Sequence, residues 1–180
     1  MKNPEFDIAI LLPTRGRAES LERSIRSLVD NADDIQRVQL MFGFDNDDEV
    51  GVQHFQDVVQ PYLNKKKVEY TAMSFEPMGY IRLNEYVNAL AGASDARWLV
   101  FWNDDAIMNT TGWDDLVEQQ VNHPMPLLRI PCANFEHPFA LFPIVVFQVY
   151  IAPDRNHYDI VQMGPYLFHR TVPYIPNRLY

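Results

Sequence analysis

The sequence predicts an α/β domain with a mostly parallel sheet and helices on both of its faces. Apolar runs of strand length alternate four times with stretches whose apolar residues recur at helical spacing. Three of the strand segments are apolar over most of their length, and the other, residues 67–73 (KVEYTAM), alternates polar and apolar residues as a strand does. With 180 residues, 47% of them hydrophobic, the chain is long enough to bury the core of one such domain.

The first strand and helix are expected near the start of the chain. Residues 6–12 (FDIAILL) have the pattern of a buried strand. We expect Pro13 to end this strand, because proline lacks the N–H group that a strand ladder uses. The loop TRGR follows, and a helix begins at Glu19. Its apolar residues at helical spacing are Leu21, Ile25, Leu28 and Val29.

Three further strand–helix pairs follow in the same order. We expect strands at residues 38–44, 67–73 and 97–102. A helix after each of them is indicated by apolar residues at helical spacing. These are Val52, Phe55, Val58 and Val59; then Leu83, Val87 and Leu90, in a helix that starts near Gly79; and last Trp113, Leu116, Val117 and Val121.

The composition changes after Asn122, where prolines and aromatic residues become frequent. Residues 139–152 indicate one or two strands with a bulge at Pro143, and HYDIVQ (157–162) indicates the start of a short helix. We therefore divide the domain into an α/β half, residues 1–122, and residues 123–180. The second part would supply further strands and an irregular C-terminal arm, which packs over the sheet or over a partner subunit in a homo-oligomer.

Charge and cysteine content exclude several classes of protein. The net charge of -9 argues against non-specific binding to nucleic acid, which needs a basic surface. A single cysteine, Cys132, excludes a disulfide framework and favours a reducing compartment. The apolar run near the start of the chain is too short for a signal sequence or a membrane span. We expect a cytoplasmic protein without a membrane span.

Polar loops follow three of the predicted strands directly: PTRGR, DNDDE and NDDA. In parallel α/β sheets, ligands bind at the carboxyl ends of the strands, so these loops are expected to meet at one site. Asp104 and Asp105 are adjacent carboxylates that repel each other. A hard cation such as Mg²⁺ or Mn²⁺, together with a bound phosphate, would relieve that repulsion. The alternative for these residues is an ordinary polar turn.

A second acidic pair, Asp114-Asp115, has a structural explanation. Thr111 stands where the N-cap of the last helix is expected, and Asp114 follows it at the spacing of a capping box. Acidic side chains in a first helical turn also face the positive end of the helix dipole. We therefore expect this pair to support the helix and not to bind a ligand.

The order of these motifs resembles the family 2 glycosyltransferases, which have the GT-A fold, a Rossmann-like fold of nucleotide-diphospho-sugar transferases. ILLPTRGRAESLERSIRSL resembles their opening strand, loop and first helix, and FGFDNDDE resembles their second strand with its nucleotide-contacting aspartate. MGYIRLNEYVNALAGASDARWLVFWNDDA resembles the helix and strand that lead into the metal-binding DXD motif. The resemblance covers Ile8 to Val121 and fades after Asn122. We expect a short or truncated member.

The resemblance implies metal-assisted, inverting transfer of a sugar from a nucleotide-diphosphate sugar, such as a UDP-sugar, to an acceptor hydroxyl. Mn²⁺ or Mg²⁺ is the implied cofactor. Residues 1–122 would bind the nucleotide sugar and residues 123–180 would face the acceptor. The implied substrate-binding residues are Pro13, Thr14, Arg15, Arg17, Asp45, Arg82, Asn103 and Asp104. The implied metal ligands are Asp105 and Asp104. In the second part of the chain, His137 of ANFEHPF is a further candidate metal ligand.

An inverting transferase needs a carboxylate that takes the proton of the acceptor. We expect Asp154, in a turn directly after an apolar run, with Glu136 as the second candidate. Two other functions stay open. One is a nucleotidyltransferase that acts on a sugar phosphate, and the other is a non-catalytic protein of the GT-A fold that binds a nucleotide.

Overall fold

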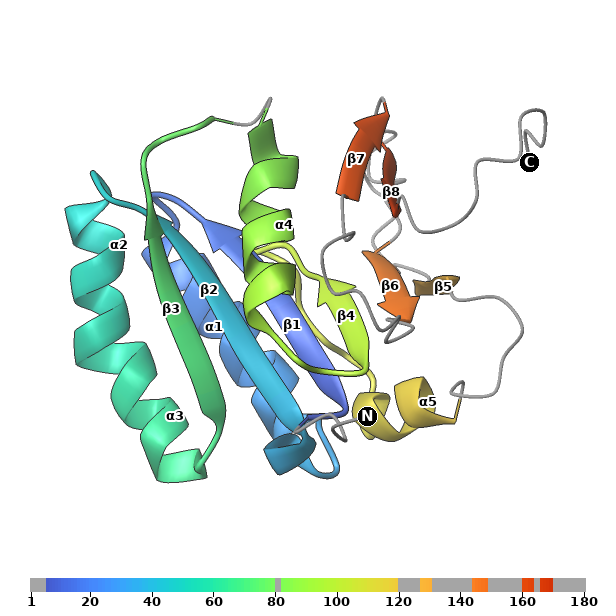
Figure 1. The fold of residues 1–180 in the computed structure, drawn as a ribbon. Coiled ribbons are helices and arrows are strands. Elements are labelled where there is room, and N and C mark those ends of the chain that lie inside the picture. Colours follow the sequence, from blue (N-terminus) through green and yellow to red (C-terminus); the bar gives the residue numbers. More distant parts are fainter. Residues whose placement is uncertain are drawn as a thin grey trace, which may run out of the picture.

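The computed structural model describes residues 6–79 and 82–119 with their side chains and, beyond these, the backbone of four strands (Figure 1). These strands are β5 (Leu127–Ile130), β6 (Ile144–Gln148), β7 (Ile160–Met163) and β8 (Tyr166–His169). The predicted site residues Glu136, His137 and Asp154 lie outside the described residues.

The main sheet has six strands in the order β3-β2-β1-β4-β6-β5. Its first four strands are parallel, and β6 and β5 continue it in antiparallel pairing. The strands β7 and β8 pair with each other. The parallel strands are β1 (Ile8–Thr14), β2 (Val38–Asp45), β3 (Glu69–Phe75) and β4 (Trp98–Phe101). The predicted mostly parallel α/β sheet is confirmed.

Helices cover both faces of the parallel strands (Figure 1). Alternate residues of β1 point to opposite faces: Ile10 packs in the larger core, with α1, the α2–α3 segment and α5, and Leu11 packs with α4. None of the helices in the described part of the chain is long and apolar enough to cross a membrane. The helices are α1 (Ala18–Asp30), α2 (Glu49–His54), α3 (Gln60–Lys66), α4 (Leu83–Ala93) and α5 (Trp113–Glu118).

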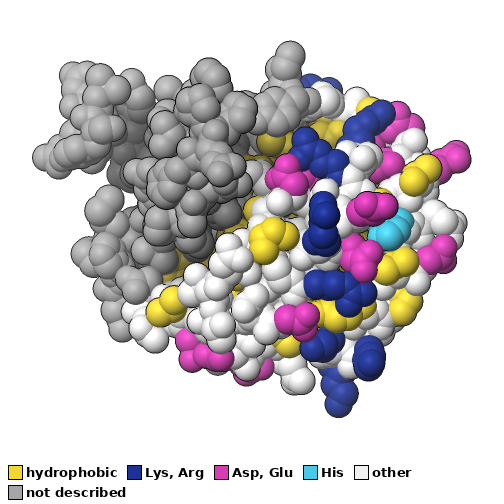
Figure 2. Space-filling view, turned by 180° about the vertical axis from the view of Figure 1, so that it is seen from behind, with side chains coloured by type: hydrophobic (Ala, Val, Ile, Leu, Met, Phe, Trp, Pro, Cys, Tyr) yellow, Lys and Arg dark blue, Asp and Glu magenta, His cyan; other side chains and the backbone are white. Residues whose placement is uncertain are grey.

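The outer surface on the α1 side carries charges of both signs close together (Figure 2). Arg26 pairs with Glu22 one turn earlier on α1, and Lys66 of α3 reaches Asp30 at the end of α1. Both pairs lie at the protein surface, where such ion pairs contribute little to stability.

The strand β1 differs from the prediction, because it continues through Pro13 to Thr14. The amide of Trp102 donates to the carbonyl of Leu11, so the backbone N–H and C=O groups of Leu11 point toward β4. The backbone of Pro13, two residues later, has the same orientation. Pairing with β4 ends at Leu11, and the missing N–H of Pro13 therefore costs no ladder bond there. On its other side, β1 stays paired with β2 up to Thr14.

The second predicted helix is longer and less regular than its apolar spacing indicates. It runs from α2 through a π-helical segment, η2 (Phe55–Val59), into α3. Pro61 is the second residue after this segment. A proline cannot donate to the carbonyl four residues earlier and its ring crowds that carbonyl, which favours the wider π-turn there. Lys67, in the left-handed conformation, ends α3, and β3 therefore starts two residues later than predicted.

Two other expectations are wrong. The stretch HYDIVQ does not begin a helix, because Ile160–Met163 form the strand β7. The N-cap of α5 is Gly112 and not Thr111, whose hydroxyl donates instead to the side-chain oxygen of Asn31, 3.4 Å away.

Candidate functional site

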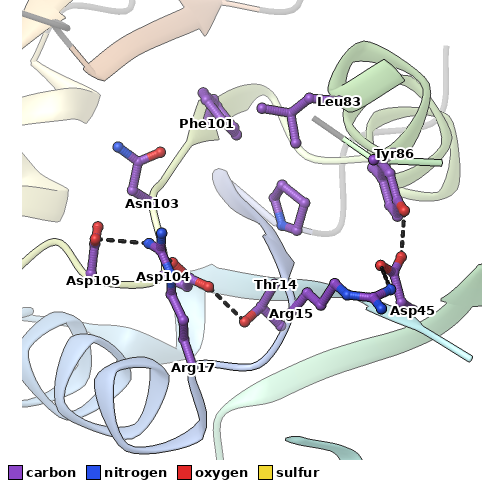
Figure 3. A pocket seen from close by; sticks show the side chains of 12 residues that line it. Thr14, Arg15, Arg17, Asp45, Leu83, Tyr86, Phe101, Asn103, Asp104 and Asp105 are labelled. Atoms are coloured by element: carbon purple, nitrogen blue, oxygen red, sulfur yellow. Dashed lines mark hydrogen bonds and ion pairs between the residues drawn. The ribbon is translucent and has the colours of Figure 1, made fainter. Parts of the chain in front are cut away.

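A cavity of about 390 Å³ opens at the carboxyl ends of β1, β2 and β4 (Figure 3). This is the edge at which parallel α/β sheets bind their ligands, and the volume is in the range of small-molecule sites. Because β1 lies between β2 and β4, the loops that follow these three strands are neighbours in space. The residues that line the cavity are Pro13, Thr14, Arg15, Arg17, Asp45, Gly79, Leu83, Tyr86, Phe101, Asn103, Asp104 and Asp105.

The structure brings together most of the site residues that the sequence indicates. Those in the cavity lining are Pro13, Thr14, Arg15, Arg17, Asp45, Asn103, Asp104 and Asp105. Arg82 is not among them: its exposed guanidinium pairs with Glu85 on the next turn of α4. The structure does not place Glu136, His137 or Asp154 relative to this cavity, since they lie outside the described residues.

One end of the cavity is built around Asp45, a buried carboxylate at the last position of β2. Arg15 donates to one of its oxygens at 2.5 Å, and the hydroxyl of Tyr86 donates to the other. Arg15 also makes two hydrogen bonds to Asp47, at 2.6 and 2.8 Å. Hydrogen bonds from its guanidinium to Asp47 and Asp45 raise the pKa of Arg15, so it carries its charge at every physiological pH.

The opposite end is built around Asp104, which is only 7% exposed. The hydroxyl of Thr14 donates to its Oδ2 at 2.7 Å, and the guanidinium of Arg17 lies 3.1 Å from its Oδ1. The same guanidinium nitrogen lies 2.8 Å from Asp105, so Arg17 bridges the two adjacent carboxylates (Figure 3). Burial raises the pKa of Asp104, against the effects of Thr14 and Arg17, which favour the carboxylate.

The loop that carries both arginines is fixed by a glycine. Gly16 has a positive φ of 65°, a conformation that residues with a side chain rarely adopt. This turn lets the amide of Gly16 donate to Asp48 at 2.7 Å, while the other oxygen of Asp48 caps α2 through the amide of Gly51. The β1–α1 loop is thereby attached to the β2–α2 loop. Arg15 extends toward Asp45, and Arg17 extends toward Asp104 (Figure 3).

The donor set at Asp104 and Asp105 suits a hard cation. Two carboxylates, with the amide oxygen of Asn103 close by in the lining, are the ligand types that Mg²⁺ and Mn²⁺ prefer. A cationic guanidinium already lies between the two carboxylates, as their repulsion requires. Among residues 6–79 and 82–119, no group of three or more His, Cys, Asp and Glu side chains is able to hold a metal alone. An ion here would therefore complete its shell with water or with phosphate oxygens of a ligand.

Sequence reasoning missed several residues of the site, of which Tyr86 has the clearest role. Its hydroxyl accepts from the amide of Met78 at 2.8 Å and donates to Asp45, so it connects α4 and the segment before it to β2. Burial and the bond to Asp45 raise its pKa. A signal was present, because Tyr86 shares a helix face with Leu83, Val87 and Leu90, and a buried tyrosine hydroxyl needs a partner.

The second acidic pair lies away from the cavity and supports the fold. The Asp114 side chain is fully buried, and its two oxygens accept the amides of Asp33 and Asp34 at 2.8 Å each. Arg37 donates to Asp114 and to Asp115. A structural role was expected, but the capping box is absent: α5 has no side-chain cap, and Asp114 instead holds the loop that precedes β2.

Comparisons with solved structures show similarity to glycosyltransferases. TarS from S. aureus (residues 1–349), in complex with UDP-GlcNAc, matches with a TM-score of 0.61 and 11% identity, over 79% of this chain and 45% of that one. The mannosyltransferase PcManGT from Pyrobaculum calidifontis, in complex with GDP-Man and Mn²⁺, matches with a TM-score of 0.60 and 10% identity, over 73% of this chain and 36% of that one.

This chain thus spans less than half of the length of these proteins. No protein-family model matches the sequence, and no curated protein matches it. At such low identity the likeness concerns the fold alone. The element order, the parallel sheet and these neighbours agree that the chain has an α/β fold of the GT-A type, as its sequence predicts.

Proposed function

We propose that this protein is a glycosyltransferase of the family 2 type, which transfers a sugar from a nucleoside-diphosphate sugar to an acceptor hydroxyl with inversion. The observation that supports it best is the cavity itself. It joins a buried aspartate at the end of β2 to an acidic pair at the end of β4, with two arginines between them. Such a cavity offers carboxylates to a base or ribose at one end and cationic groups to a diphosphate in the middle.

In this proposal Asp45 accepts a hydrogen bond from the base or the ribose of the nucleotide. Tyr86 holds the carboxylate of Asp45 in place from α4, and Arg15 forms an ion pair with it. Pro13 and Thr14 line the pocket floor at the end of β1. Asp104 and Asn103 face the donor sugar or ribose, and Arg82 joins the diphosphate by leaving its surface partner Glu85.

Asp105 and Asp104 are the proposed metal ligands, with His137 as a further candidate. A bound Mn²⁺ or Mg²⁺ would act as a Lewis acid that neutralises the departing diphosphate. Residues 123–180 form the acceptor side in this proposal and supply the catalytic base, for which we propose Asp154 and, as the second candidate, Glu136. The neighbour PcManGT is described with Mn²⁺ and GDP-Man, which supports testing these ligands first.

The test is nucleotide binding measured by thermal shift with UDP, GDP and other nucleoside diphosphates, with and without Mn²⁺. A ligand at about 100 times its Kd adds about 2.7 kcal/mol to stability, which raises Tm by several degrees. We expect Asp45→Asn and Tyr86→Phe to weaken binding of the preferred nucleotide about tenfold or more, because a buried charged acceptor is lost or misplaced. Arg23→Ala, on the exposed surface of α1, is the matched control and should bind as the wild type does.

Full retention of binding in Asp45→Asn would show that the nucleotide does not occupy this cavity. The two alternative functions, a nucleotidyltransferase and a non-catalytic nucleotide-binding protein, are distinguished by the products that form. Incubation with a nucleoside triphosphate and a sugar phosphate releases pyrophosphate only from a nucleotidyltransferase. A non-catalytic protein would bind the nucleotide and leave every nucleotide sugar and acceptor unchanged.

A further inference from the structure

Arg17 lies where the site needs a cation. Its guanidinium contacts Asp104 at 3.1 Å and Asp105 at 2.8 Å, and both contacts are made by the same nitrogen. Adjacent carboxylates repel each other, and a positive charge between them relieves that repulsion. In the structure, that charge comes from the side chain of Arg17, which follows the glycine turn of the β1–α1 loop (Figure 3).

Asp104 is more tightly fixed in position than Asp105. Asp104 is buried, and its second oxygen is occupied by the hydroxyl of Thr14, so its position is fixed. Asp105 and Arg17 each have 55% of their side chains exposed, and water can solvate either when they separate. An exposed ion pair contributes only about 0.2–1 kcal/mol, so a divalent cation has little to overcome in replacing Arg17 at Asp105.

The charges that line the cavity favour such an exchange. Two arginines face three aspartates there, and the cavity is therefore negative by one charge. A diphosphate brings further negative charge and would be repelled. A divalent cation at Asp105 reverses the sign of the cavity. It also releases a guanidinium, whose planar donors suit phosphate oxygens.

We propose that Arg17 is the internal counter-ion of Asp104 and Asp105 and that it exchanges with a divalent cation. In the ligand-free protein Arg17 neutralises the pair. When the cation binds at Asp105, Arg17 turns from the carboxylates to the diphosphate of the nucleotide. Arg17 thus competes with the metal in the absence of nucleotide and assists the nucleotide in the presence of metal. This inference rests on the proposed function for the identity of the diphosphate ligand.

The first experiment measures Mn²⁺ binding without nucleotide, by electron paramagnetic resonance of the free ion. Removal of the competing guanidinium in Arg17→Ala should tighten Mn²⁺ binding about two- to fivefold relative to the wild type. Arg23→Ala removes the same charge from the first turns of α1, where Arg23 contacts only the hydroxyl of Ser20 among the described hydrogen bonds. This control should bind Mn²⁺ as the wild type does.

Two further variants locate the effect. Asp105→Asn in the Arg17→Ala background should abolish the gain, because the ion is expected at Asp105. Arg17→Lys keeps one charge at the end of a flexible side chain and should give an intermediate Mn²⁺ affinity.

With saturating Mn²⁺, Arg17→Ala should bind UDP more weakly than the wild type, so the affinity for Mn²⁺ and the affinity for UDP change in opposite directions. Circular dichroism and thermal unfolding confirm that each variant is folded.

The inference is overturned if Arg17→Ala binds Mn²⁺ no more tightly than the wild type, or if the gain persists in the Asp105→Asn background. It is also overturned if no variant binds Mn²⁺. The proposed function is judged separately, by nucleotide binding that depends on Asp45 and Tyr86. Loss of the Arg17 effect with retention of Asp45-dependent binding rejects the exchange and leaves the transferase proposal standing.

Discussion

Asp114 illustrates how one buried carboxylate can support a fold from within an acidic motif. Its side chain is completely buried, yet it is ionised, because two backbone amides and Arg37 donate to it. Burial alone would raise the pKa of Asp114, but the amides of Asp33 and Asp34, together with Arg37, outweigh burial and lower it. Asp115, next to it, is half exposed and shares only the contact with Arg37.

We therefore expect Asp114→Asn to destabilise the protein by about 3 kcal/mol at neutral pH. The variant breaks a buried ion pair with Arg37, and it places the NH₂ group of asparagine against a backbone N–H, so that two donors face each other. Asp115→Asn, the matched control, should cost less than about 1 kcal/mol because it is exposed. Urea unfolding measures both. Equal effects in the two variants would contradict the assignment of the structural role to Asp114.

The destabilisation caused by Asp114→Asn is expected to depend on pH. The pKa of Asp114 is lower in the folded protein than in the unfolded chain, so its carboxylate contributes stability in full above about pH 4. The contribution disappears as the pH falls through the folded-state pKa. The difference in unfolding free energy between wild type and Asp114→Asn should therefore shrink when urea unfolding is repeated in acid. A difference that stays constant with pH would exclude an ionised Asp114.

At the scale of elements, the loop before α5 decides where this helix is placed. Gly112 has a positive φ of 68°, and its amide donates to the carbonyl of Asn31 at 2.8 Å. A Cβ atom on Gly112 would lie 2.6 Å from a carboxylate oxygen of Asp33. The close approach attaches α5 to the end of α1. Trp113, the first residue of α5, then donates from its indole N–H to the carbonyl of Leu28.

Gly112→Ala should cost about 2 kcal/mol or more of unfolding free energy, because the left-handed backbone is unfavourable for alanine and Asp33 has to move. Gly92→Ala is the matched control. Gly92 lies within α4, and a Cβ atom added there would meet open space. The alanine variant should therefore gain up to about 1 kcal/mol of unfolding free energy from its better helix propensity. The two changes are compared by thermal and urea unfolding. A harmless Gly112→Ala would show that the α1–α5 contact is not needed for stability.

At the scale of the whole molecule, the proposed reaction needs both parts of the chain. The described lining of the cavity comes from residues 13–105, whereas the proposed base comes from residues 123–180.

Asp154→Asn should reduce sugar transfer by on the order of 10²-fold or more while nucleotide binding stays unchanged, because a general base acts on the acceptor and not on the donor. Glu136→Gln is the parallel variant. Transfer rates with the preferred nucleotide sugar and the thermal shift with its nucleotide are measured side by side. Wild-type transfer by Asp154→Asn would remove this residue from the mechanism, and full activity of both variants would leave the chain without its proposed base.

The sequence by itself determined the alternation of strands and helices and the edge at which the site lies. Short apolar runs bounded by turn residues favour strands buried on both faces, and polar residues directly after such runs are expected at the carboxyl ends of a parallel sheet. For that reason Arg15, Asp45 and Asp104 were assigned to one site without knowledge of their contacts. The apolar periodicity also located α1, α4 and the approximate limits of β2 and β4.

Only the tertiary structure decided which side chains meet. Tyr86 and Asp45 are 41 positions apart, and Asp33 and Asp114 are 81 apart. These contacts depend on the strand order, which places β4 beside β1, and on the angle at which each helix packs. Hydrophobic periodicity shows which face of an element is buried and carries no information about its neighbour. The folded structure alone showed that Arg15 pairs with Asp45 and Asp47 while Arg17 pairs with Asp104 and Asp105. It also supplied the contacts through which Asp114 acts, although a structural role for this residue was expected from the sequence.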